Sequence, residues 1–516
     1  MNPPNIILII LDTLRGDRVF EEDYLHLTPF MKALMEKSLI FKNCIANSPW
    51  TYPSHISMFT GLYHSQSTML SKSIMDLSKK IPILTEILKK IGYFTTAYTE
   101  NPYISKITGL TRGFNFVFNN YKDPTGWFIK RKRVELFLIK LEKFIERTIK
   151  YQPLVKLYKR IPFKILIDII ARSKIDFPLK SYFYKYKNNT KKKFRDFRNL
   201  LKKNKGVKPF YIVFNIMATH MPYAPEKCVL KHFQFTKREY SLISAIMYNN
   251  YLLRLNLNMN THKLSNEASN ALNKIYNASI YQSDLVVKRI FELINKLDLM
   301  DDAYIIITSD HGEHLCTDED HLLWQHSTLQ SVYRPVIKVP LMIFHPKFNT
   351  KLINEQVQLK DLFHTIIHMT GRKNQNLNIE YSLLYQIEHQ SMPKYILGEY
   401  LKTEDYINDI IAVSNNYGKK MKEKYLNSKI EKDICFLRSN KYKYINFNND
   451  IEEFYDIESD PYELRNIFNK NNEIYKEMKA YLENLLSNNK NINLLENVVT
   501  RKEKDTLKNI ITKLKL

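Results

Sequence analysis

Three short apolar runs constrain the fold of this chain more than any other feature. They are NIILIIL at residues 5–11, PFYIVFNIM at 209–217 and AYIIIT at 303–308. A short, wholly apolar run is best explained as a parallel strand buried on both faces. Helical patterns occur between such runs, at 28–36, 83–91 and 270–297. This alternation predicts an α/β fold, in which helices cover both faces of a mostly parallel sheet.

The domain organisation follows from where this pattern stops. A chain of 516 residues exceeds the usual single-domain range, so we expect more than one unit or large insertions. The pattern breaks at about residue 121 and resumes at Pro209, which marks 122–206 as an insertion. We therefore predict a main domain over 1–375, a small α+β subdomain with an antiparallel sheet over 376–470, and a Lys- and Asn-rich helical tail over 471–516.

Positive charge is concentrated in the insertion. Residues 130–205 hold 25 Lys and Arg against 6 Asp and Glu, which is 19 of the 25 net positive charges. Apolar residues recur there at helical spacing. The segment is either a helical pair that packs on the core or an amphipathic surface that docks on anionic lipid. We expect no nucleic-acid partner, because no recognised binding module is present.

The cysteines and the N-terminus indicate the compartment. The four Cys are widely scattered and form no CxxC, so neither a zinc site nor a disulfide framework is suggested. Residues 1–4 lead directly into the first strand without a basic segment or a cleavage site. We therefore expect a cytoplasmic protein, with peripheral contact to the inner face of the membrane if the basic segment docks there. The oligomeric state stays open.

Two strand ends each deliver a carboxylate. Asp12 follows the first apolar run, and Asp310-His311-Gly312 lies just past AYIIIT. In open α/β sheets, ligands bind beyond the carboxyl ends of the strands. A structural carboxylate or a capped turn is the alternative at each position. Carboxylate with imidazole suits Mn²⁺ or Zn²⁺ better than an all-oxygen calcium site. We predict one divalent ion, with Mn, Zn, Ca and Mg all kept open.

A hydroxyl residue lies between these strands in the sequence. Thr51 comes two residues before Pro53, which suits the first turn of a helix. The residue is either a helix cap or a nucleophile, and an alcohol attacks only when it is activated. A metal that binds its oxygen would lower the pKa of the alcohol. Together with the carboxylates, Thr51 indicates a metal-assisted esterase site for an anionic ester.

Two histidines and one arginine complete the candidate site. His220 and His326 each lie beside a predicted strand, where they could stabilise substrate oxygens or protonate a leaving group. Each could equally be an ordinary polar side chain. Arg15 is close to Asp12 in sequence. It binds the substrate anion or forms a structural ion pair, and we weigh these two roles equally.

Five motifs, in order along the chain, resemble those of the sulfatases of the alkaline phosphatase superfamily. They are PNIILIILDTLRGDRV, WTYPSHISMFTGLY, TSDHGEHL, WQHSTLQSVYRPVIKVPLMIF and FYDIESDPYELRN, which together run from residue 4 to 466. The resemblance implies an alkaline phosphatase-like three-layer sandwich and a hydrolase of sulfuric or phosphoric esters. It places Asp12, Thr51, Asp310 and His311 on the metal.

The resemblance also assigns roles to other residues. Thr51 takes the position of the nucleophile, and His55 that of the arginine that supports it. His220 takes the position of a substrate-binding histidine, and His326 stands roughly where many members have a lysine that contacts the anion. In many members the nucleophile is formylglycine, which is made from Cys or Ser and not from Thr.

The threonine at position 51, in place of a residue that can become formylglycine, affects the reaction that we expect. Formylglycine hydrate can expel sulfate by collapsing to the aldehyde, whereas threonine has no such exit. We therefore expect attack of Thr51 on a sulfate, phosphate or phosphonate ester. One alternative is a phosphotransferase that passes the group from Thr51 to an acceptor alcohol. The other is a non-catalytic member that binds anionic glycans or lipids.

Overall fold

The computed structural model describes residues 3–68, 77–119, 194–206, 209–248, 263–326, 331–372, 378–401, 433–447 and 451–489. An eight-stranded sheet forms its centre, with the strand order β4-β3-β5-β1-β6-β7-β2-β8. The strands are β1 (Asn5–Leu11), β2 (Ser38–Ile45), β3 (Phe94–Thr99), β4 (Phe116–Asn119), β5 (Phe210–Ile216), β6 (Ala303–Thr308), β7 (Lys338–Phe344) and β8 (Lys351–Gln358). Only β7 runs antiparallel to its neighbours, β6 and β2. The predicted α/β class and mostly parallel sheet are therefore confirmed.

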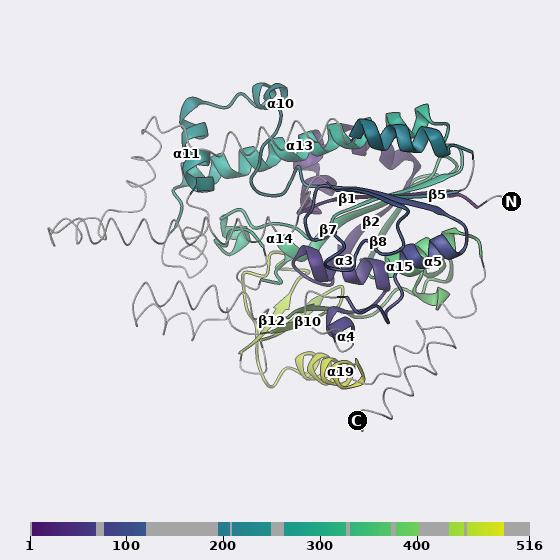
Figure 1. The fold of residues 1–516 in the computed structure, drawn as a ribbon. Helices are drawn as coiled ribbons and strands as arrows, with labels where there is room; N and C mark the ends of the chain where they lie inside the picture. Colours follow the sequence, from purple (N-terminus) through teal and green to yellow (C-terminus); the bar gives the residue numbers. More distant parts are fainter. Residues whose placement is uncertain are drawn as a thin grey trace, which may run out of the picture.

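The alternation of side chains along β1 divides the core in two. Ile6, Leu8 and Ile10 point into one apolar cluster. Ile7, Ile9 and Leu11 point into the other. Figure 1 shows α13 (Asn266–Lys296) along one face, and α3 (Thr51–Thr60), α5 (Leu84–Lys90) and α15 (Asp361–Met369) along the opposite face. Burial on both faces explains why these central strands are apolar throughout.

The register of the central strands brings the predicted site together. Leu11 at the end of β1 pairs with Ile216 of β5, and Ile10 pairs with Thr308 of β6. The three strands are parallel, so the residues that follow them emerge at one edge of the sheet. Asp12 and Asp310 emerge at this edge because each lies just past the end of its strand.

A second, antiparallel sheet of four strands lies beside the first. Its order is β12-β11-β10-β9, with β9 (Ile396–Tyr400), β10 (Ile434–Arg438), β11 (Tyr442–Phe447) and β12 (Ile451–Asp456). Helix α19 (Glu473–Asn489) covers it (Figure 1). Tyr475, Met478 and Leu482 of α19 pack against this sheet in a separate small core. The predicted antiparallel sheet is therefore present, while the predicted domain boundaries stay predictions.

Two local predictions from the sequence pattern are wrong. The apolar residues of 357–369 predict a helix, but β8 continues to Gln358 and α15 begins at Asp361. The polar composition of 232–266 predicts an irregular segment, but α11 occupies Lys237–Tyr248, preceded by α10 (Lys227–His232). Most of the basic insertion, residues 120–193, lies outside the described residues, as does the tail beyond 489. Among the helices that the structure describes, none is long and apolar enough to cross a membrane.

Candidate metal and nucleophile site

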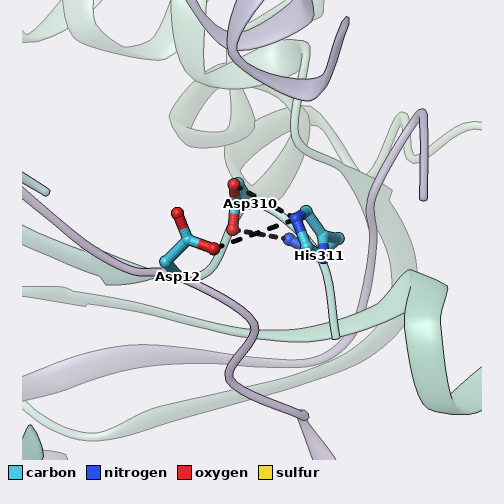
Figure 2. A group of neighbouring side chains, drawn as sticks. All are labelled: Asp12, Asp310 and His311. Carbon is cyan, nitrogen blue, oxygen red and sulfur yellow. Dashed lines mark hydrogen bonds and ion pairs between the residues drawn. The ribbon is translucent and has the colours of Figure 1, made fainter. Parts of the chain in front are cut away.

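The candidate metal ligands converge at the edge of the large sheet. Asp12, Asp310 and His311 each offer a ligand atom within 4.8 Å of the others, and all three side chains are fully buried. His311 Nε2 lies 3.5 Å from Asp310 Oδ2 and 3.9 Å from Asp12 Oδ1. Figure 2 shows the two carboxylates and the imidazole turned toward one another. This is the grouping that the two strand ends predicted.

The two carboxylates have the chemistry of a cation site. Asp12 Oδ1 and Asp310 Oδ2 are buried and accept no hydrogen bond. Burial raises the pKa of both carboxyl groups, and the negative charge of the nearby Asp310 raises the pKa of Asp12 further. Two buried carboxylates this close repel each other unless a proton or a cation lies between them. A divalent ion satisfies both oxygens, so these residues fit a metal of the kind the sequence predicted.

The backbone fixes which nitrogen His311 presents. Its Nδ1 lies 3.0 Å from the Gly312 carbonyl, an arrangement in which Nδ1–H donates and Nε2 is left as the acceptor. Burial lowers the pKa of His311 to about 3, so the ring is neutral. A neutral imidazole with an available Nε2 is the form that binds a metal. Gly312 is required here because a Cβ would lie 2.0 Å from the Pro335 carbonyl oxygen.

Thr51 is the first residue of α3 and lies beside this group. Its Oγ1 is 3.3 Å from His311 Nε2, and its side chain is buried. Trp50 caps the helix in an extended conformation, so Thr51 itself makes no capping bond. Ser54 on the next turn donates to the Asp310 carbonyl at 2.6 Å, which ties α3 to the loop after β6. The helix start therefore holds the hydroxyl against the candidate metal ligands.

His55 approaches Thr51 through the backbone. Its Nδ1 is 2.8 Å from the Thr51 carbonyl oxygen and 3.6 Å from Asp310 Oδ2. The ring packs edge-on against Phe59. The structure therefore places His55 between the first turn of α3 and a candidate ligand. From there it supports the position of Thr51 without a contact to the hydroxyl.

His220 and His326 lie next to the candidate metal ligands. The ring of His326 is 4.2 Å from that of His311 and 5.2 Å from that of His220. His220 Nδ1 lies 2.5 Å from the Met221 carbonyl. The segments after β5 and after β6 thus bring both predicted histidines to the candidate metal ligands, although 106 positions separate them in the sequence.

Arg15 belongs to a different cluster. Its guanidinium makes ion pairs of 2.7 Å with both Asp17 and Asp320, and all three side chains are buried. These partners raise the pKa of Arg15, although burial alone would lower it, and Arg15 holds the pKa of Asp320 well below its usual range. The contacts match the structural ion pair that the sequence left open. They give no support to substrate binding by Arg15.

Three site residues were not predicted. Asn101 donates to Asp12 Oδ2 at 2.6 Å, and the amide of Thr13 donates to Asp310 Oδ1 at 3.3 Å. Glu313 is fully buried and contacts His326. Asn101 lies two residues past the end of β3, so the strand-end rule that found Asp12 could also have found it. The partner of Glu313 could not be foreseen, because it lies on a separate loop.

The sequence profile of the Sulfatase family matches residues 4–372. The chain belongs to the sulfatase family. It is accordingly an ester hydrolase, and the family usually binds a divalent metal ion, for which Asp12, Asp310 and His311 form a candidate site. The predicted family and enzyme class are confirmed.

Individual relatives are distant in sequence but similar over most of their length. Arylsulfatase K of Homo sapiens is 23% identical, over 94% of this chain and 82% of its own length. Choline-sulfatase of Rhizobium meliloti (strain 1021) is 20% identical, over 90% and 82%. Among solved structures, the phosphonate monoester hydrolase of Agrobacterium radiobacter has a TM-score of 0.61 at 17% identity, covering 94% of this chain and 95% of its own. A protein bound to its substrate D-glucosamine-2-N,6-O-disulfate also has a TM-score of 0.61, at 16% identity and coverages of 95% and 98%. The similarity confirms the alkaline phosphatase-like fold.

Proposed function

We propose that this sulfatase-family hydrolase is metal-dependent and uses Thr51 as its nucleophile on a sulfate, phosphate or phosphonate ester. One observation carries the proposal. Thr51 Oγ1 lies 3.3 Å from His311 Nε2, at the start of a helix and beside two buried carboxylate oxygens that accept no hydrogen bond from the described residues. The first turn of a helix also favours an anion there. The hydroxyl is therefore placed where an anionic ester and a cation would meet.

The chain's own residues then have separate tasks. Asp12, Asp310 and His311 would hold the ion, which when bound lowers the pKa of an alcohol and offsets negative charge on the ester. Thr51 Oγ forms the new bond to phosphorus or sulfur while the bond to the ester oxygen breaks. His220 or His326 accepts the proton of the Thr51 hydroxyl and then donates it to the departing oxygen. Water then releases the group from Thr51 and regenerates the hydroxyl.

The choice of Thr favours phosphorus as the reacting atom. A threonine ester has no aldehyde into which it can collapse, so the second step also requires attack at the central atom. We propose that phosphate or phosphonate esters are cleaved faster than sulfate esters. The phosphonate monoester hydrolase among the structural neighbours is consistent with this preference. Transfer to an acceptor alcohol would use the same Thr51 intermediate, with an alcohol in place of water.

A panel of chromogenic sulfate, phosphomonoester, phosphodiester and phosphonate substrates, assayed with each candidate metal, tests the proposal. Thr51→Ala should lose several orders of magnitude in kcat and keep its fold, since Thr51 makes no capping bond. Thr51→Ser should retain measurable turnover. Near wild-type turnover by Thr51→Ala would instead indicate direct attack by water. An added alcohol that appears in the product would indicate transfer.

We propose a cytoplasmic protein that contacts anionic membranes through residues 130–205, where positive charge is concentrated.

A further inference from the structure

We infer that Glu313 is a positioning residue for His326, which it holds by Nδ1 so that Nε2 faces the ester. The inference rests on the proposed function, because it gives His326 its orientation in that reaction. Glu313 lies two residues past His311 and is fully buried. Its Oε1 is 2.9 Å from His326 Nδ1. His326 itself is 11% exposed, so the pair runs from a fully buried carboxylate to a partly exposed ring.

A second contact locks the Glu313 carboxylate in place. Tyr223 donates its hydroxyl to Glu313 Oε2 at 3.2 Å and is itself buried. The Tyr223 ring packs edge-on against Tyr276, whose hydroxyl donates to the Thr13 carbonyl at 2.7 Å. The carboxylate is thus anchored to the segment after β5 and, through Tyr276, to the loop that follows Asp12. An anchored acceptor restricts the rotation of the imidazole that it holds.

The chemistry of imidazole explains why this matters. A ring held by a carboxylate at Nδ1–H presents Nε2 on its opposite side. The His326 ring is 4.2 Å from that of His311, so the ring that Glu313 holds lies next to a candidate metal ligand. Without Glu313 the side chain could rotate or exchange its tautomer. The carboxylate therefore selects one orientation and one tautomer of His326.

A double-mutant cycle with four proteins tests the inference by activity: wild type, Glu313→Ala, His326→Ala and the double variant. Glu313→Ala should lower kcat by about 10- to 100-fold, the usual effect of losing a partner that orients an active-site histidine. In the His326→Ala background the same substitution should change kcat by less than about threefold, because the ring it orients is gone. Equal losses in both backgrounds would overturn the inference.

Two further variants separate positioning from structure. Glu313→Gln keeps an oxygen that can accept from Nδ1–H, so it should recover most of the loss seen in Glu313→Ala. Glu453→Gln is the matched control. Like Glu313, Glu453 is buried and accepts from tyrosine, here from the hydroxyls of Tyr333 at 2.9 Å and Tyr455 at 3.1 Å, but it lies in the small sheet. Its substitution should leave kcat per folded molecule unchanged. A Glu313→Gln protein as inactive as Glu313→Ala would contradict the role.

A spectroscopic measurement makes the inference independent of turnover. In protein labelled with ¹⁵N-histidine, the His326 signal is identified by its absence in His326→Ala. Wild type and Glu313→Gln should show the tautomer protonated at Nδ1, and Glu313→Ala a mixture. An unchanged His326 signal in Glu313→Ala would refute the inference. If wild type cleaves no ester of the panel, the proposed function fails while this measurement still reports on the Glu313–His326 pair.

Discussion

At the scale of single residues, Asp310 is the most direct probe of the metal site. Its Oδ1 accepts from the amides of Thr13 and His311, so Oδ2 is the oxygen available to a cation. Asp310→Asn removes the negative charge and places an NH₂ group near the ion. We expect loss of both bound metal and turnover, measured by elemental analysis and with the ester panel. Asp318→Asn, an exposed carboxylate seven residues after His311, is the control. Full metal content in Asp310→Asn would show that the ion binds elsewhere.

Residues at strand ends were predictable, and residues that depend on contacts between loops were not. Asp12 and His311 were found because the ends of parallel strands meet at one edge of the sheet. Thr51 was found from the proline that marks the start of its helix. Glu313 carries no such signal, because its role depends on His326, whose loop position the sequence does not specify. Arg15 shows the converse: proximity to Asp12 in sequence did not bring its guanidinium into the site.

At the scale of elements, helix α15 contains a carboxylate whose ionisation is unfavourable. Asp361 opens the helix and is fully buried, with Oδ2 unpartnered. Burial raises its pKa from 3.8 to about 7, although Lys360, with Nζ 3.9 Å away, opposes the shift. The folded state thus keeps a proton that the unfolded state releases. Asp361 therefore makes a contribution to the free energy of unfolding that falls as pH rises from about 4 to about 7.

Asp361→Asn removes this dependence. Between pH 5 and pH 8 we expect the stability difference to move in favour of the variant by about 2 kcal/mol, from about 1.4 kcal/mol per pKa unit. Urea unfolding of both proteins at the two pH values measures it. Glu380→Gln, an exposed carboxylate near the same helix, should show no such change relative to wild type. A difference that stays constant with pH would mean that Asp361 is ionised in the folded state throughout.

The same helix shows why some elements escaped prediction. Leu359, Leu362 and Phe363 are all fully buried at the i, i+3, i+4 spacing of one apolar helix face, and the buried Val357 continues the apolar run before them. Yet Val357 lies in β8, where it pairs with Cys44 of β2. The apolar pattern of an edge strand that runs into a helix is continuous, so periodicity alone cannot place the boundary. The antiparallel direction of β7 was missed for a similar reason, since strand direction depends on the connection and not on composition.

At the scale of the whole molecule, the two sheets are joined through buried polar contacts. The sequence predicted a second, antiparallel sheet within residues 376–470, but not how this sheet would attach to the first. Lys443 of β11 is fully buried, and its Nζ donates to the Val332 carbonyl at 2.5 Å and to Glu463 Oε2 at 2.7 Å. Val332 precedes α14 (Arg334–Ile337) of the large unit. Tyr333 adds a hydrogen bond of 2.9 Å to Glu453 of β12. Lys443 therefore links the small sheet to the segment that follows the His326 loop.

Removing one partner of the Lys443–Glu463 pair should lower the free energy of unfolding strongly, whereas removing both charges should lower it much less. Burial lowers the pKa of Lys443 and raises that of Glu463, so each charge is held in the core mainly by the other. Lys443→Ala leaves the carboxylate buried and unpaired, which should cost about 3–5 kcal/mol in urea unfolding. Lys443→Met with Glu463→Gln removes both charges and should recover most of that loss. Lys441→Ala breaks an exposed pair with Glu458 and should destabilise the protein far less than Lys443→Ala, because solvent screens that pair. If the double variant were as unstable as Lys443→Ala, the carbonyl of Val332, and not the ion pair, would be the contact that joins the two sheets.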